Sequence, residues 1–298
     1  MPTVLSVVKY HRGMNPESRK VETTRPKRRM STGQRLLFFL TAWLICLMPF
    51  LFWWNTWFGR QLPDKQLVEY LSDEKKPRHI QHALVQIGER MGKRDASVTR
   101  WYPDLIRLAS HHVEEVRNTD AWVMGQDTSG SGFHEALLKM LTDSSPLVRG
   151  NAALSLVRFG DSSGRMEIVR LLQPAIVNAP QAGAITDNST IGMAIHQNGV
   201  IAKLKTRDQI VEIRSPISGR LRTLSVQTGK NVSAGEEIAT VAPATDQAWE
   251  ALRALYLIGQ LEDLPAVLPY ERELPDISDH VRQQAVETEK AIKERSKH

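Results

Sequence analysis

A helical motif recurs along the chain at a fixed interval, and this recurrence limits the possible folds more than any other feature. Val-Arg followed by small or apolar residues at helical spacing occurs in VEEVRNTDAWVMG (113–125), SPLVRGNAALSLVRFGD (145–161) and DHVRQQAVETEKAI (279–292). The first two Val-Arg pairs begin at residues 116 and 148, an interval of 32 residues. An interval of about 20–50 residues is typical of solenoids, so we expect stacked helices.

The same interval predicts an insertion. A fourth helical segment, which lacks Val-Arg, is DQAWEALRALYLIGQLEDLPAVL (246–268). If Trp249 takes the position of the Val, it precedes Val281 by 32 residues. Residues 148 and 249 are 101 apart, which is 69 more than one repeat. We therefore expect about 69 extra residues, 175–243, between two consecutive repeats.

The segment LTDSSPLVRGNAALSLVRFGD closely resembles a HEAT repeat, a pair of antiparallel helices that stacks into a solenoid. The resemblance covers about 65–174 and 246–292, and it implies a solenoid because each helix pair exposes an apolar face that only its neighbour buries. It also implies a structural role between repeats for the family's arginine, which here is Arg117, Arg149 and Arg282.

Within the insertion, helical spacing gives way to short apolar runs separated by Gly, Asn, Ser and Pro, which favours a small β domain. Its glycines follow Ser215-Pro216 in a pattern that resembles the second half of a biotinyl/lipoyl domain, a flattened β-barrel of two four-stranded sheets. We expect tight turns or close backbone approach at Gly219, Gly229 and Gly235.

Carrier members of that family hold their cofactor on a lysine at a hairpin tip, eight residues before the proline. Counting back from Pro216 gives Asp208, which has no amine for an amide bond to biotin or lipoate. Lys205 lies three residues from that position. We therefore expect a lipoyl-like module without a cofactor.

An uncharged apolar run, residues 36–58, follows a basic tail. As a helix it would measure about 35 Å, enough to cross a hydrocarbon core of about 30 Å. Residues 1–35 hold nine Lys and Arg against Glu17 and Glu22, so the net charge of +6 is concentrated there. We expect a single transmembrane helix in contact with membrane lipid, a cytoplasmic tail, a periplasmic bulk and no nucleic-acid partner.

A lipoyl-like module without its lysine, behind such an anchor, resembles in part the membrane-anchored periplasmic adaptor (membrane fusion) proteins. Those proteins have a coiled-coil hairpin between the two lipoyl halves, whereas here the module interrupts a helical solenoid. The resemblance implies protein partners in a transport or secretion assembly, and homo-oligomerisation stays open.

Motifs for chemistry are sparse. His111 and His112 precede Glu114 and Glu115, but consecutive residues on a helix point in different directions, so we expect no metal site. The glycine-rich DTSGSGF (127–133) lacks the lysine of a phosphate loop. No catalytic arrangement stands out, so we expect no enzymatic activity.

These observations predict an α+β fold and a non-enzymatic, membrane-anchored scaffold or adaptor. The alternatives are a biotin or lipoate carrier subunit of a membrane-bound transfer complex and, from another HEAT-type group, a bilin lyase. The expected divisions are a tail (1–35), a transmembrane helix (36–58), HEAT-like repeats (59–174), a lipoyl-like domain (175–245) and further repeats with a C-terminal helix (246–298).

Overall fold

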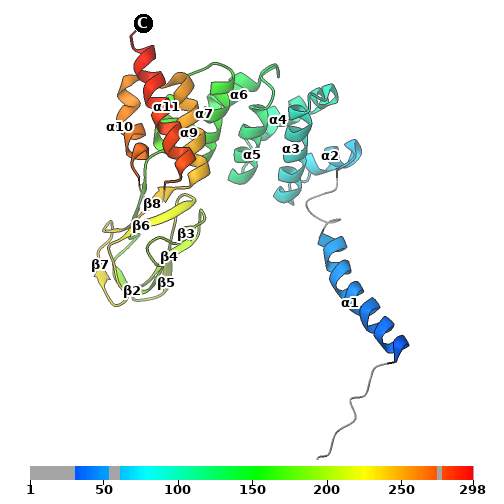
Figure 1. The fold of residues 1–298 in the computed structure, drawn as a ribbon. Helices are drawn as coiled ribbons and strands as arrows, with labels where there is room; N and C mark the ends of the chain where they lie inside the picture. Colours follow the sequence, from blue (N-terminus) through cyan, green and yellow to red (C-terminus); the bar gives the residue numbers. More distant parts are fainter. Residues whose placement is uncertain (1–30, 54–60, 274–276, 298) are drawn as a thin grey trace, which may run out of the picture. The chain divides into compact units, whose positions relative to one another are not determined.

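The computed structural model describes residues 31–53, 61–273 and 277–297 (Figure 1). The chain divides into two units, Met1–Arg60 and Gln61–His298. Helix α1 (Thr32–Trp53) belongs to the first unit, and every other element belongs to the second. The fold combines helices with two antiparallel four-stranded sheets.

The predicted transmembrane helix is wrong. Within the described part of the chain, no helix combines the length and the apolar character needed to cross a bilayer. Helix α1 shares residues 36–53 with the expected span, which is about 27 Å of helix against a hydrocarbon core of about 30 Å. Residues 54–58, and residues 1–30 of the expected tail, lie outside the described residues. The lipid contact and the periplasmic location depended on this helix and are withdrawn with it.

The second unit is built mainly from helix pairs. In each pair the two helices contact one another, and the second helices of successive pairs lie side by side in the order α3, α5, α7, α9, α11. The pairs are α2 (Asp64–Leu71) with α3 (Pro77–Gly92), α4 (Tyr102–Leu108) with α5 (Glu114–Met124), α6 (Phe133–Met140) with α7 (Pro146–Arg158), α8 (Arg165–Leu171) with α9 (Thr245–Ile258), and α10 (Leu264–Val267) with α11 (Asp279–Arg295). Short 3-10 helices are η2 (Ala96–Trp101), η3 (Leu261–Asp263) and η4 (Leu268–Glu271).

Helix α7 shows how the sequence sets these elements. The Ser145 side chain accepts a hydrogen bond from the Val148 amide, and Pro146 occupies the first helical turn, where its missing N–H costs nothing. Val148, Ala152 and Leu156 follow at intervals of four residues and are fully buried. This stripe faces the neighbouring helices, as the repeat pattern predicts.

The strands of the second unit form two sheets with a core of their own. Sheet order is β1-β8-β6-β3 in one and β5-β4-β2-β7 in the other, all antiparallel. Buried Ile185, Ile201, Leu204, Leu221 and Ile238 lie in this core. The two sheets match the architecture that the lipoyl resemblance implies. The strands are β1 (Ala175–Asn178), β2 (Gly183–Asn188), β3 (Ala194–Ile195), β4 (Val200–Lys205), β5 (Ile210–Arg214), β6 (Gly219–Leu224), β7 (Asn231–Val232) and β8 (Glu237–Pro243).

The strands, which we call the β module (residues 175–243), follow α8 and precede α9. Helices α8 and α9 nonetheless contact each other, and α9 also contacts α7. One apolar cluster therefore joins Val157 and Ile168 before the module to Leu252 and Leu255 after it. The module thus lies between the two helices of one pair. The 32-residue repeat interval predicts a position between two consecutive repeats, and this prediction differs from the structure.

Candidate functional site

The repeat arginine of α5 connects successive helix pairs. The Arg117 guanidinium donates from Nε to Asp143 Oδ2 at 2.6 Å and from a terminal nitrogen to Asp143 Oδ1 at 2.9 Å. A further nitrogen donates to the His111 carbonyl at 2.7 Å. The hydrogen bond from Arg117 lowers the pKa of Asp143, and the same bond raises the pKa of Arg117. The pair therefore stays ionised and fixes the turn before α7 against the start of α5.

Arg149 repeats part of this pattern one interval later. It donates to the carbonyls of Asp143 (2.8 Å) and Ser144 (3.1 Å), as Arg117 does to those of His111 and His112, and its Nε donates to Glu167 at 3.1 Å. Arg282 differs, because its described partner is Asp279 on the same helix, at 2.9 Å. Arg117 and Arg149 thus bind turns and neighbouring helices, whereas Arg282 makes a local pair.

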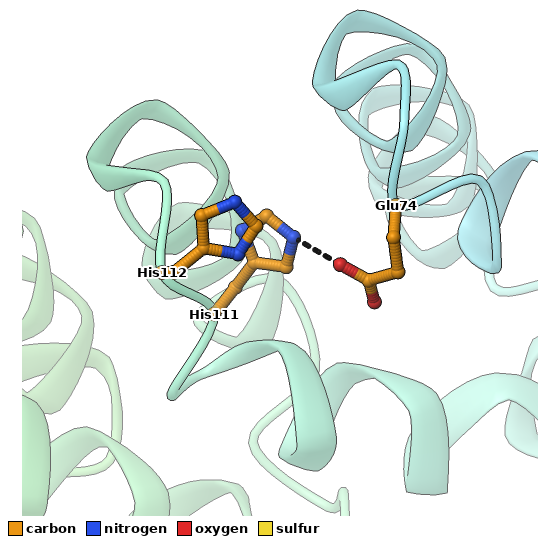
Figure 2. Close-up of side chains that lie close together, drawn as sticks. All are labelled: Glu74, His111 and His112. Carbon is orange, nitrogen blue, oxygen red and sulfur yellow. Dashed lines mark hydrogen bonds and ion pairs between the residues drawn. The ribbon is translucent and has the colours of Figure 1, made fainter.

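Three side chains gather at the turn before α5, where Figure 2 shows Glu74, His111 and His112. Their potential ligand atoms lie within 4.8 Å of one another. His111 Nε2 lies 2.8 Å from Glu74 Oε2, and the two histidine rings are 4.4 Å apart between centroids. The amide of Val113 donates to His111 Nδ1 at 3.0 Å.

This hydrogen bonding assigns the tautomer of His111. Nδ1 accepts from a backbone N–H, so in the neutral ring Nε2 carries the proton and donates to Glu74. Neither nitrogen then has a lone pair available for a metal ion or for taking a proton from a substrate. The cluster is best described as a hydrogen-bonded turn and not as a metal or catalytic centre.

The repeat interval explains why a histidine occupies this place. His111 precedes Asp143 by 32 residues, and Asp143 Oδ1 accepts from the Ser145 amide at 2.8 Å just as His111 accepts from Val113. Both residues also bind a side chain of the preceding helix pair. Asp143 binds Arg117, and His111 binds Glu74. Sequence reasoning missed Glu74 because 37 residues separate it from His111.

Helix α5 also holds a buried acid. Asp120 is fully buried, and neither carboxylate oxygen has a hydrogen-bond partner among the described residues. Burial raises the pKa of Asp120 well above its ordinary value, and the positive charge of Arg107 offsets only part of this effect. Burial therefore favours the protonated, uncharged form of this side chain.

Asp208 lies in the tight turn between β4 and β5. Thr206 and Gln209 close this turn, with the Thr206 amide donating to the Gln209 carbonyl at 2.9 Å, and Asp208 is exposed. Lys205 pairs with Ile210 across the two strands, below the tip. The residue at the tip of this turn is thus an aspartate.

The three glycines of the module meet different demands. Gly229 and Gly235 have positive φ (91° and 81°), as tight turns require. A Cβ on Gly219 would lie 1.8 Å from the Ala242 carbonyl oxygen, so β6 and β8 approach too closely there for a side chain. Pro216 lies in the exposed bend before β6.

A groove crosses the second helices of the last four pairs. It has a volume of about 650 Å³ and takes residues from α5, α7, α9 and α11. We call it the inner groove and define it by Trp122, Asn151, Leu154, Glu250, Arg253 and Leu257. Sequence analysis missed it, although one signal was present: Leu257 lies off the buried stripe of its helix and is 59% exposed.

Comparison with known proteins supports the repeat. A family model described as HEAT repeat matches residues 135–163, which cover α7 and most of α6. The chain therefore contains a HEAT repeat, although the match spans only a small part of the 298 residues. No curated protein matches. The resemblance to membrane-anchored adaptors thus receives no support, whereas a HEAT repeat suggests a protein-interaction scaffold.

Two solved structures show distant similarity. One is a single-chain, multi-domain long-chain acyl-CoA carboxylase, with 13% identity and a TM-score of 0.23 over 32% of this chain and 10% of that chain. The other is an engineered protein, with 17% identity and a TM-score of 0.38 over 78% of this chain and 80% of that chain. This chain thus spans about a tenth of the carboxylase. At these TM-scores, neither similarity supports a conclusion about fold or function.

Proposed function

We propose that the chain is a non-enzymatic scaffold that binds partner proteins through the inner groove, with the β module as a cofactor-free interaction module. The observation that supports this best is the exposed side chains along the second helices. Leu257 and Tyr256 on α9 and Trp122 on α5 are 59%, 43% and 38% exposed. Aromatic and arginine side chains dominate the binding energy of protein interfaces, and Arg158 and Arg253 line the same groove.

The polar clusters support a binding role over a catalytic one. His111 uses both ring nitrogens inside the repeat, and the ion pair of Arg117 with Asp143 connects two helix pairs. These side chains are committed to holding the solenoid in shape. A rigid row of helices is the feature that presents an extended surface to a partner.

The experiment compares captured partners between matched variants of the full chain. Leu257→Ser removes an exposed apolar side chain from the inner groove, and Met166→Ser removes one from α8, where Met166 is 54% exposed outside the groove. Crosslinking in cells and affinity purification should recover a partner with the unaltered chain and with Met166→Ser but lose it with Leu257→Ser. Equal recovery with both variants would remove the groove from the proposal.

Intact mass distinguishes the carrier alternative. The chain purified from cells supplied with biotin and lipoate should have the mass of its sequence, because Asp208 at the hairpin tip has no amine. A mass increase that matches either cofactor would contradict a cofactor-free module. The Lys205→Arg variant would then show whether Lys205 is the acceptor.

A further inference from the structure

We propose that the inner groove binds an extended peptide segment of a partner that carries basic residues next to apolar ones. This inference rests on the proposed scaffold function and adds the chemistry of the partner. It follows from the extent of the groove, from the amides on its floor and from the distribution of charge along it.

The groove is long enough for a peptide. A second hollow of about 280 Å³ shares Asn151, Leu154 and Glu250 with the inner groove, so the two are continuous. Together they cross α5, α7, α9 and α11, and packed helices are about 8–10 Å apart. Three such spacings equal about 24–30 Å, the length of roughly eight extended residues.

Two asparagines supply groups that can pair with a peptide main chain. Asn151 Nδ2 donates to Asn118 Oδ1 at 2.8 Å, which links equivalent places on α7 and α5. In the described part of the chain, Asn118 Nδ2 and Asn151 Oδ1 have no hydrogen bond of their own. Both residues line the second hollow. They therefore offer one donor and one acceptor, as an extended backbone requires.

The arginines of the groove are already engaged. Arg158 donates to Gln126 Oε1 at 2.9 Å. Arg253 lies over the Trp249 ring at 4.5 Å and within 3.6 Å of Glu250. Arg253 therefore has an ionic partner on the chain itself, whereas Arg158 is hydrogen-bonded to neutral groups only.

Two carboxylates of the hollows have no ionic partner in the part of the chain that the structure describes. Glu287 on α11 and Asp246 on α9 line the two hollows, and neither makes an ion pair among the described residues. The two carboxylates outnumber Arg158, which also makes no ion pair among the described residues, so the net charge of the hollows is negative and a partner with lysine or arginine complements it. Apolar partner residues would cover Leu257 and Leu154.

The test measures binding of the full chain to a nine-residue, fluorescein-labelled peptide of alternating Lys and Leu by fluorescence anisotropy. A peptide with Glu for Lys and one with Ser for Leu serve as controls. The chain has a net charge of +6, so its overall charge would favour the acidic peptide. Binding of the Lys-Leu peptide at least tenfold more tightly than either control supports the proposal, and equal or reversed affinities overturn it.

Matched variants locate the binding. Glu287→Gln combined with Asp246→Asn should weaken binding of the Lys-Leu peptide several-fold while the protein stays folded, as its melting curve will show. Glu262→Gln, which lines neither hollow, should leave the affinity unchanged. Unchanged affinity in the double variant overturns the proposal. A dimer in sedimentation velocity that Leu257→Ser dissociates would also overturn it, because a second copy would then occupy the groove. Loss of a crosslinked partner in Leu257→Ser without Lys-Leu binding would leave the scaffold function standing and refute only this inference.

Discussion

Arg117 on α5 and Asp143 before α7 form a two-pronged ion pair that crosses from one helix pair to the next. Both side chains are largely buried, with 12% and 10% exposure. Arg117 also binds the carbonyl of His111, so a single guanidinium holds two turns of the solenoid together. This relationship gives the repeat arginine a measurable structural role.

Substitution of Arg117 should therefore destabilise the protein strongly. Arg117→Ala leaves the Asp143 carboxylate buried without its partner, which should cost about 2–4 kcal/mol in the free energy of unfolding. Arg117→Lys should restore only part of this, because an ammonium cannot form the two-pronged contact. Urea denaturation of the full chain measures both. Arg282→Ala is the matched control and should cost less than about 1 kcal/mol, since its partner Asp279 is 92% exposed. Similar losses for Arg117→Ala and Arg282→Ala would contradict the assigned role.

Asp120 should make stability fall as pH rises. Its pKa is raised in the folded state, so the folded protein binds this proton more tightly than the unfolded chain. Its contribution is then greatest below the ordinary pKa of about 3.9 and declines above it, by up to about 1.4 kcal/mol per pH unit until the folded-state pKa is reached. Asp120→Asn imitates the protonated acid and should be the more stable protein at pH 7.

Urea denaturation between pH 4 and pH 7 checks this expectation. The difference in unfolding free energy between Asp120→Asn and the unaltered chain should widen with pH. A difference that stays constant between pH 4 and pH 7 would contradict a raised pKa for Asp120.

His111 should matter for the turn and not for metal binding. His111→Asn keeps an acceptor for the Val113 amide but loses Glu74, so it should cost about 1 kcal/mol, whereas His111→Ala loses both contacts and should cost more. Thermal denaturation measures which of the two variants loses more stability. Zinc should shift the melting temperatures of His111→Asn and the unaltered chain equally. A zinc shift that His111→Asn abolishes would refute the tautomer assigned to His111.

The close contact between β6 and β8 should make Gly219 the most sensitive glycine of the β module. Gly219→Ala places a methyl group against the Ala242 carbonyl and should cost more than about 3 kcal/mol. Gly229→Ala meets no neighbouring atom and should cost about 1–2 kcal/mol through its positive φ. Amide hydrogen exchange of β8, measured by mass spectrometry, compares the two variants. Greater loss of protection in Gly229→Ala would show that β6 and β8 can separate to admit the methyl group.

Local patterns predicted the parts of the fold that short segments determine. The repeat motif around Val148 marks α7, which lies within the HEAT repeat at residues 135–163. The apolar run of residues 36–58 predicts a membrane span that the described residues do not support. The groove around Leu257 and the contact of Glu74 with His111 were also missed, since both join side chains that only the tertiary fold brings together.

The pairing of β1 with β8 has a consequence for the order of folding. Ala175, directly after α8, lies opposite Val241, just before α9. Closing a chain loop of about 70 residues costs roughly 4 kcal/mol in entropy before α8 and α9 can meet. If the strands pair first, that loop shrinks to a few residues at either side of the sheet. The β module would then hold the end of α8 close to the start of α9. These two helices could therefore pair although the module separates them in the sequence.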